Sequence, residues 1–400
     1  MCTPPIFRLL AAPILVLGFC AFPAWAVPTQ SISPSRITRV TRRLSDSVTR
    51  GLAPQGAKLI HRDSTNLSPF AACNSNQAWP WTAAFSPGGA HLYVPLFGGY
   101  AGQGGCTLLK LDALTLQHQG TIQVQESPEE VVFTTNTNGS MALGFVTNSS
   151  ASSVSIFDAT DAVLTHLAIP VRPGNTFGTA FPFGMAVSPD QSTVWVGTSE
   201  GRIFAIDVAS RTLDSNRTID LGAAVGLARF GFLGNQLILP ATSYHQNYQG
   251  STAKLILLDP AHPAMTQEVI LGTSPTASAF PSPQDFAIRN GKIYVAGFDL
   301  GPQVVVADTQ TLALDTPIPT GTGHPGGKFQ ALTISASGLL LVADYTTAEI
   351  ARIDTNTDSL LGVVPASTYG YGPQELTISP DGQTLLVPTA AGNLVRFDLR

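Results

Sequence analysis

Short apolar runs that end in aspartate recur along the whole chain. Seven of these runs end at Asp112, Asp158, Asp207, Asp259, Asp308, Asp354 and Asp398. Successive aspartates are 44 to 52 residues apart. A regular period of this length indicates a repeat architecture in which each unit is one supersecondary element. Each aspartate stands where a strand becomes a turn, where its side chain can accept backbone N–H groups, so we expect a structural role for it.

Within each unit, apolar runs of four to six residues alternate with turn signals, and no segment has sustained helical periodicity. A first strand is followed by a turn such as Ser379-Pro380-Asp381-Gly382, and a second strand by a polar loop. The third strand ends at the periodic aspartate, and a fourth, such as Thr165–Ile169, closes most units. This order predicts an all-β fold, a seven-bladed β-propeller of four-stranded antiparallel blades over residues 77–400.

The last unit lacks a fourth strand, because the sequence stops at Arg400 directly after the third. An N-terminal extension, residues 27–76, does not fit the repeat but carries a candidate strand near residues 57–61. We expect this strand to complete the last blade, because pairing the two ends would close the ring and cover an open edge.

The first 26 residues have the features of a secretory signal peptide. Arg8 precedes the apolar stretch Leu9–Phe22, and Ala24-Trp25-Ala26 offers a cleavage site. An uncleaved membrane anchor is the alternative, although Pro13 and Pro23 interrupt the apolar stretch, which is short for a span. We therefore expect a periplasmic or secreted protein without a membrane span after cleavage.

Two cysteines, Cys73 and Cys106, remain after removal of the signal. In an exported chain two cysteines are expected to pair, so a disulfide is predicted, with two buried free thiols as the alternative. Charged residues make up 12% of the chain and the formal net charge is -5. A negative charge argues against a nucleic-acid partner. We expect a monomer that binds a protein or a small polar ligand.

The repeat units resemble those of the YVTN-type, YncE-like seven-bladed propellers. The segments Gln284–Thr311 and Gln374–Asp398 match that repeat best. The literal Tyr-Val-Thr-Asn is absent, and its nearest copies begin at Tyr93 and Tyr294. The resemblance implies an exported binding or surface protein, with some relatives among lactonases and amine-dehydrogenase-like quinoprotein subunits.

Propellers bind ligands at one mouth of the channel, where the chain enters the innermost strands. Aligning these seven segments by sequence places one residue of each at the same position: Thr82, Glu130, Gly184, Leu227, Asp285, Gln330 and Glu375. Three carboxylates and a glutamine would then share one axial space. Each carboxylate could cap backbone N–H groups of its own blade or meet channel water. Alternatively, Glu130, Asp285 and Glu375 could bind Ca²⁺ or Mg²⁺, which prefer oxygen ligands.

Other residues could also contribute to this mouth. The insert Tyr244–Gln249 lengthens one loop of the fourth unit, and such loops often bind ligands. His324 precedes an inner strand, although a lone histidine is more often structural. The aromatic residues near the same segments could form walls of the mouth or pack between blades: Trp79, Trp81, Phe183 and Phe329.

The sequence contains no haem-attachment, zinc-protease, nucleophile-elbow or phosphate-binding motif. We therefore expect an exported propeller that binds a ligand or protein partner at the channel mouth. A divalent-metal-dependent lactonase or lyase is one alternative. A quinoprotein amine-dehydrogenase-like subunit is another.

Overall fold

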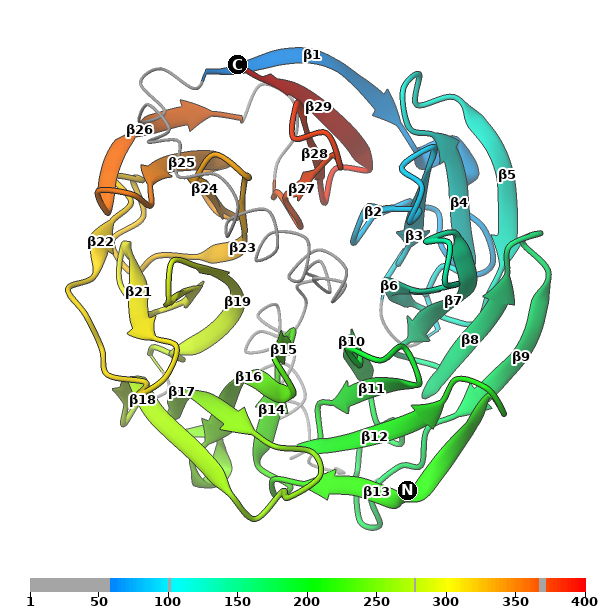
Figure 1. Ribbon diagram of the computed structural model, residues 1–400, viewed down its shortest axis with the longest axis horizontal. Helices are drawn as coiled ribbons and strands as arrows, with labels where there is room; N and C mark the ends of the chain where they lie inside the picture. Colours follow the sequence, from blue (N-terminus) through cyan, green and yellow to red (C-terminus); the bar gives the residue numbers. More distant parts are fainter. Residues whose placement is uncertain (1–57, 100–101, 277, 367–371) are drawn as a thin grey trace, which may run out of the picture.

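Seven antiparallel sheets stand around a central axis in the computed structural model of the protein (Figure 1). The structure describes residues 58–99, 102–276, 278–366 and 372–400. The predicted signal peptide and most of the N-terminal extension lie outside these residues. No helix in the described part of the chain is long and apolar enough to cross a membrane.

Each sheet is one blade, and its strands follow one another from the axis outwards. Blades 1 to 3 contain β2 (Ala84–Phe85), β3 (His91–Leu96), β4 (Thr107–Asp112) and β5 (His118–Gln123); β6 (Pro128–Thr135), β7 (Met141–Asn148), β8 (Ser153–Asp158) and β9 (Val163–Ala168); and β10 (Pro182–Val187), β11 (Thr193–Thr198), β12 (Arg202–Asp207) and β13 (Thr212–Asp220). In blade 4 the innermost strand is divided into β14 (Val225–Leu227) and β15 (Gly231–Leu233), followed by β16 (Gln236–Tyr244), β17 (Ser251–Leu258) and β18 (Thr266–Ser274).

The remaining blades follow the same order. Blades 5 and 6 contain β19 (Ser282–Arg289), β20 (Lys292–Phe298), β21 (Gln303–Asp308) and β22 (Ile318–Pro319), then β23 (Phe329–Ile334), β24 (Leu339–Asp344), β25 (Glu349–Asp354) and β26 (Ser359–Pro365). Blade 7 contains β27 (Thr377–Ile378), β28 (Thr384–Pro388), β29 (Asn393–Leu399) and β1 (Leu59–Asn66). Only two short 3-10 helices, η2 (Ser68–Phe70) and η3 (Gln246–Tyr248), occur in the described ranges. The predicted seven-bladed fold is confirmed.

The first and last described strands close the ring. Strand β1 pairs antiparallel with β29, and the register runs from Leu59 opposite Leu399 to Asn66 opposite Asn393. Figure 1 shows β1, in blue, lying along the red β29. Because β29 would otherwise expose an unpaired edge, β1 both completes blade 7 and removes that edge. The predicted closure by an N-terminal strand is confirmed.

Adjacent blades are joined by apolar cores and by tyrosines. The buried core residues form clusters that span neighbouring blades; one of them unites residues of blades 2 and 3. Tyr93 of blade 1 donates its hydroxyl to Asp161 of blade 2 at 2.8 Å. Tyr294 of blade 5 does the same to Asp358 of blade 6 at 2.9 Å. The nearest copies of the Tyr-Val signature therefore connect one blade to the next.

The periodic aspartates organise turns, as expected. Six of them accept backbone N–H groups two or three residues further along the chain, as Asp308 does from Gln310 at 2.9 Å and Thr311 at 2.8 Å: Asp112, Asp158, Asp207, Asp259, Asp308 and Asp354. Asp398, near the end of β29, forms ion pairs with Arg62 and Arg400 instead. The structural role predicted for these residues is confirmed for the six.

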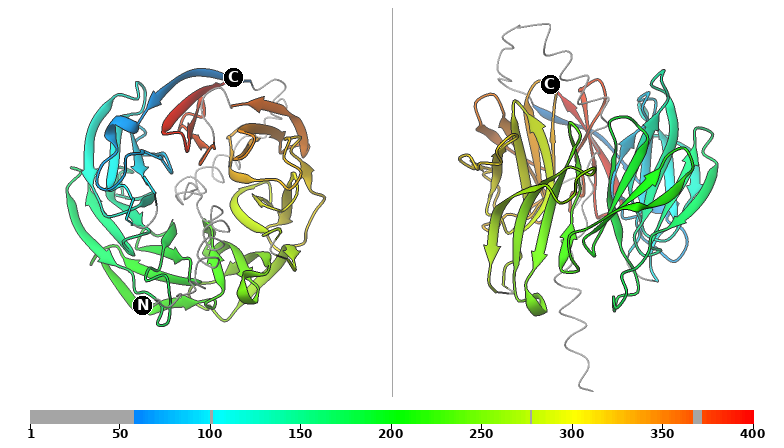
Figure 2. Two further views of the ribbon diagram at one scale, coloured as in Figure 1. Left: turned by 180° about the vertical axis from the view of Figure 1, so that it is seen from behind. Right: turned by 60° about the horizontal axis from the view of Figure 1, so that its bottom comes forward.

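Alternating strand directions separate the loops onto two faces (Figure 2). We call the face with the loops entering each first strand and those between second and third strands the mouth face. The opposite face, here the turn face, carries the Ser-Pro-Asp-Gly-like turns and the periodic aspartates. The insert Tyr244–Gln249 lies on the mouth face, between β16 and β17.

A disulfide joins Cys73 and Cys106, whose Cα atoms are 5.8 Å apart. Cys73 lies in the segment that leads from β1 into blade 1, and Cys106 directly precedes β4. The bridge therefore ties the ring-closing segment to the first complete blade. The predicted pairing is confirmed.

Candidate functional site

Every innermost strand carries one extra residue relative to its neighbour. In blade 2, for example, Pro128 pairs with Asn148 and Val131 with Val146, so three steps on β6 match two on β7. The pairings of the other six blades show the same one-residue excess. Side chains of a regular strand point into the two interblade spaces, whereas a β-bulge re-aims a side chain. The seven bulges therefore provide side chains that can point towards the axis.

The strand pairings define two rows of equivalent residues at these bulges. The row nearer the mouth, here the bulge row, consists of Trp81, Glu129, Phe183, Ala228, Gln284, Gln330 and Gln374. The next row, here the clamp row, consists of Thr82, Glu130, Gly184, Arg229, Asp285, Ala331 and Glu375. Nearly all of their side chains are buried.

This register corrects the alignment made from the sequence at two blades. Arg229, not Leu227, is the clamp-row residue of blade 4, and Ala331, not Gln330, is that of blade 6. The divided inner strand of blade 4 concealed the shift. Ala228 donates its N–H to the Pro240 carbonyl at 3.1 Å, as Trp81 does to Pro95 and Gln374 to Pro388. Aligning these prolines would not have identified Arg229, because the proline follows its partner by 14 residues in blades 1 and 7 but by only 12 in blade 4.

The three clamp-row carboxylates each bind the neighbouring blade. Glu130 Oε2 accepts the N–H of Met185 in blade 3 at 2.7 Å. Asp285 Oδ2 accepts the N–H of Leu332 in blade 6 at 2.9 Å. Glu375 Oε2 accepts the N–H of Ala83 in blade 1 at 2.8 Å. The carboxylates therefore do cap backbone groups, but mainly across the blade interface rather than within their own blade.

Arg229 brings a cation into this ring of acids. Its Nη1 lies 3.3 Å from Glu375 Oε1 and 4.0 Å from Asp285 Oδ2, and all three side chains are at most 3% exposed. Blades 4 and 7 lie on opposite sides of the ring (Figure 1), so the Arg229 side chain crosses the channel to reach Glu375. The guanidinium group thus partly neutralises the carboxylates that the sequence suggested as metal ligands.

Burial raises the pKa of every acid in this cluster. Desolvation raises the pKa of Glu129 to about 8, and those of Asp285 and Glu375 to about 7, although the nearby Arg229 opposes each shift. The pKa of Glu130 also lies well above its ordinary value, mainly because of burial. Burial lowers the pKa of Arg229, against the attraction of the four acids. The acids therefore retain protons near neutral pH.

Several buried polar atoms of the two rows have no hydrogen-bond partner among the described residues. The donors are Arg229 Nε and Nη2, Gln374 Nε2 and Trp81 Nε1. The acceptors are Glu129 Oε2, Glu130 Oε1 and Gln284 Oε1. A buried polar group without a partner is costly, so native structures rarely contain a cluster of them without a reason such as water or a ligand.

The aromatic residues suggested as mouth walls divide into two groups. Trp81 packs against Phe97 and Trp79, with ring centroids 4.8 and 5.9 Å away. Phe183 lines a mouth-side cavity together with Gln284, Thr242 and Tyr244. Its volume, about 10 Å³, is enough for roughly one water molecule.

Phe329 does not form a wall of the mouth. It is fully buried in the core between blades 5 and 6, because the first residue of β23 faces the neighbouring blade. Of the two roles considered for Phe329, the structure therefore shows packing between blades.

Two further predicted site residues lie at different depths. Gln330 belongs to the bulge row, and its Nε2 donates to Gln374 Oε1 at 3.2 Å. His324 lies outside both rows, in the mouth-face loop between β22 and β23, where it is partly exposed. Its Nδ1 accepts the N–H of Gly326 at 3.2 Å. A local loop role accounts for this histidine.

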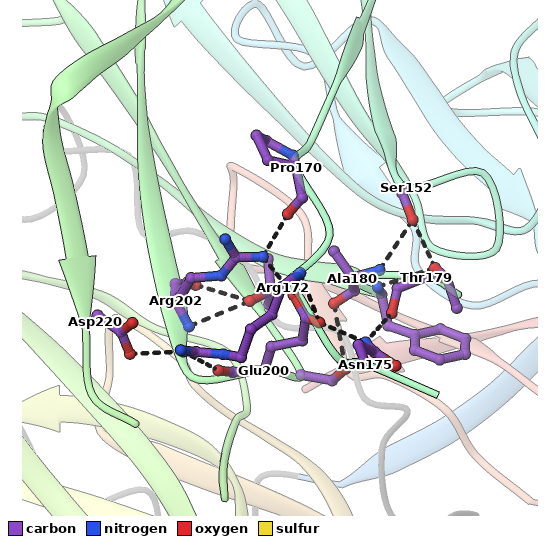
Figure 3. Close-up of polar contacts among 12 residues, drawn as sticks. Ser152, Pro170, Arg172, Asn175, Thr179, Ala180, Glu200, Arg202 and Asp220 are labelled. Carbon is purple, nitrogen blue, oxygen red and sulfur yellow. Dashed lines mark hydrogen bonds and ion pairs between the residues drawn. The ribbon is translucent and has the colours of Figure 1, made fainter. Parts of the chain in front are cut away.

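A network around Glu200 fixes the loop that leads into Phe183 (Figure 3). The buried Glu200 carboxylate accepts the Arg172 N–H at 2.9 Å and the Asn175 side-chain amide. It also pairs with Arg202 Nη2 at 2.5 Å, and that nitrogen donates to the Pro170 carbonyl as well. The loop between β9 and β10 is therefore held to blade 3 before the chain enters its bulge.

The carboxylates do not fit the divalent-cation site that the sequence suggested. One oxygen of each already accepts a backbone N–H, and Arg229 lies beside two of the three acids. Among the described residues, no group of three histidines, cysteines or acids is placed to hold a metal ion. This geometry disfavours Ca²⁺ or Mg²⁺ at Glu130, Asp285 and Glu375.

No protein-family model and no curated protein matches this chain in sequence. The likeness to YVTN-type repeats therefore holds at the level of the seven-bladed propeller fold. Membership of that family stays a prediction.

Proposed function

We propose that this protein is an exported, non-enzymatic propeller that binds a small polar ligand at the mouth end of its channel. The observation that carries the proposal is the cluster of buried polar atoms without partners in the bulge and clamp rows. Binding sites in proteins combine a mostly apolar surround with a few convergent polar groups, and the aromatic residues Trp81 and Phe183 supply the apolar part.

Export is supported by two separate features. The first 26 residues have the composition of a signal peptide. The Cys73–Cys106 disulfide is typical of proteins in oxidising compartments. Periplasmic and secreted locations both agree with these features.

The two enzymatic alternatives receive less support. A metal-dependent lactonase or lyase would need a cation at acids that Arg229 and backbone N–H groups already engage. A quinoprotein-like subunit would need a cofactor-bearing partner, and no described residue points to one.

The proposal is tested by thermal melting of the purified protein with three probes of different chemistry: sodium acetate, choline chloride and glucose. We expect at least one probe to raise Tm. The rise should disappear in the double variant Gln284→Leu/Gln374→Leu, which keeps side-chain volume but removes two polar groups of the bulge row.

The matched control is Gln303→Leu, which removes a glutamine at the start of β21, away from both rows. It should keep the full response to the probe. The proposal fails if none of the three probes raises Tm, or if the double variant responds as strongly as the control.

A further inference from the structure

The inference concerns the guanidinium group of Arg229 and rests on the function proposed above. Nη1 of Arg229 is engaged by Glu375 and Asp285. The other two nitrogens, Nε and Nη2, are buried and have no partner among the described residues. The guanidinium group therefore forms ion pairs through Nη1, whereas the edge that carries Nε and Nη2 has no partner among the described residues.

The open edge has a specific shape. The N–H bonds of Nε and Nη2 run parallel along one side of the planar guanidinium group. Two parallel donors match the two oxygens of a carboxylate, which arginine binds bidentately. A single water or hydroxyl oxygen would accept these two parallel N–H groups only through bent, weaker hydrogen bonds.

The other groups without partners also favour a ligand that accepts hydrogen bonds. Gln374 Nε2 and Trp81 Nε1 are donors. Glu129 and Glu130 each have one oxygen without a partner, and a protonated carboxyl group can donate from such an oxygen. Donors therefore outnumber acceptors around the axis when the acids hold their protons.

We propose that the ligand of this site is a small organic carboxylate, which binds the Nε–Nη2 edge of Arg229 and takes up a proton into the acid cluster. The carboxylate forms two hydrogen bonds with the arginine, and a protonated acid of the cluster can donate a third. No covalent bond forms between the ligand and the protein, and the only bond made is the O–H bond of the newly protonated carboxyl group. The proton comes from solvent and remains shared among the buried acids.

The negative charge of the ligand explains why its binding is coupled to the uptake of a proton. An added anion would face repulsion from ionised acids, so binding favours the state in which more of the acids are protonated. Tyr244, which lines the nearby cavity, stays neutral because burial raises its pKa. The ionisable groups acting on Arg229 are Glu129, Glu130, Asp285 and Glu375.

Calorimetric titration of the wild-type protein tests this proposal without any substitution. The probes are sodium acetate, lactate and succinate, each at pH 6 and pH 8, with acetamide as the neutral counterpart of acetate. We expect at least one carboxylate to bind about tenfold or more tightly at pH 6 than at pH 8, because proton uptake is linked to binding. Acetamide should bind at least about tenfold more weakly than acetate at pH 6.

A variant tests the role of the two parallel donors of Arg229. Arg229→Lys keeps the positive charge but cannot offer two parallel donors, so it should weaken carboxylate binding at pH 6 by about tenfold or more. The control is Arg217→Lys, which changes an arginine that pairs with Asp214 on the outer strand β13 and should leave the affinity unchanged. If Arg229→Lys does not fold, the proposal is still tested by two comparisons on the wild-type protein: the affinity at pH 6 against that at pH 8, and acetate against acetamide.

The proposal is overturned if no carboxylate binds, if affinity is unchanged or rises between pH 6 and pH 8, or if acetamide equals acetate. These outcomes differ from failure of the proposed function. If choline or glucose stabilises the wild-type protein but not the Gln284→Leu/Gln374→Leu variant, the mouth is still a binding site, and only its assignment to carboxylates is wrong.

Discussion

The axial acids and the periodic aspartates carry the same chemical group in opposite surroundings. On the turn face, Asp308 is partly exposed to solvent, and hydrogen bonds from its own turn lower its pKa. At the axis, Glu130 is buried, and desolvation raises its pKa. The turn aspartates accept hydrogen bonds from backbone groups two or three residues away. The axial acids accept hydrogen bonds from the neighbouring blade, and some of their oxygens have no partner among the described residues. A conspicuous repeat therefore marks the scaffold, and the less regular positions mark the candidate site.

Removal of the positive charge of Arg229 should have the largest effect on stability. Arg229→Leu leaves Asp285 and Glu375 buried without a counter-ion, which is expected to lower the free energy of unfolding by about 3–5 kcal/mol at pH 8. The loss should be smaller at pH 5, where the acids are protonated. Urea denaturation at both pH values measures it. Arg62→Leu, an arginine that is 46% exposed, serves as the control and should change little. Equal effects of the two variants would remove the distinction between axis and surface.

The pH dependence of the wild-type protein should separate the two sets of acids. Glu129, Asp285 and Glu375 ionise near pH 4–4.5 when unfolded but near pH 7–8 when folded, so the free energy of unfolding falls as pH rises from the lower to the higher value. The turn aspartates have lowered pKa values when folded, so their stabilisation is lost as pH falls below about 4.

Stability is therefore highest near pH 5. We expect Tm at pH 5 to exceed that at pH 8 by at least about 2 °C. Calorimetric scans across this range measure the difference. A Tm that rises from pH 5 to pH 8 would contradict the protonation of the axial acids.

A single neutral substitution should flatten this profile. Glu130→Gln keeps an oxygen that can accept the Met185 N–H but cannot ionise. The difference in Tm between pH 5 and pH 8 should therefore shrink, chiefly through a higher Tm at pH 8. Glu268→Gln, on the outer strand β18 beside Lys254, should leave the profile unchanged. A Glu130→Gln profile parallel to that of the wild-type protein would mean that Glu130 is ionised at pH 8 in both states.

The smallest effect is expected at the periodic aspartates. Asp308→Ala removes the acceptor of two turn N–H groups and should lower Tm at pH 7 by on the order of 1 °C. Asp308→Asn keeps a side-chain oxygen in the turn and should lower Tm less. Melting curves of the two variants make this comparison. A larger loss for asparagine than for alanine would show that the charge, rather than the turn, matters at this position.

The sequence predicts the fold well because local patterns record it. The period of the aspartates, the turn residues and the missing last strand together identify seven blades and the closing segment near Leu59. These signals are repeated along the chain or lie within a few residues of one another, so the fold can be predicted even though one unit is irregular. The Cys73–Cys106 pairing follows equally directly, from the small number of cysteines.

The sequence predicts the arrangement of the candidate site only in part. It places Glu130, Asp285 and Glu375 at equivalent positions, and the strand pairings agree, because the segments entering these three blades align without a shift. It does not identify Arg229, because the inner strand of blade 4 is divided and the aligned position falls on Leu227, two residues earlier. Which blade each carboxylate would bind was also not predictable, since that depends on the packing of neighbouring blades rather than on the repeat.

Infrared spectroscopy of the carboxyl groups tests the central distinction most directly. At pH 7 we expect the wild-type protein to show the carbonyl absorption of protonated, buried carboxyl groups. The substitutions Glu129→Gln and Glu130→Gln should reduce that absorption, whereas Asp308→Asn should leave it unchanged. A spectrum at pH 7 with only ionised carboxylates, unaffected by the two glutamate substitutions, would contradict the account.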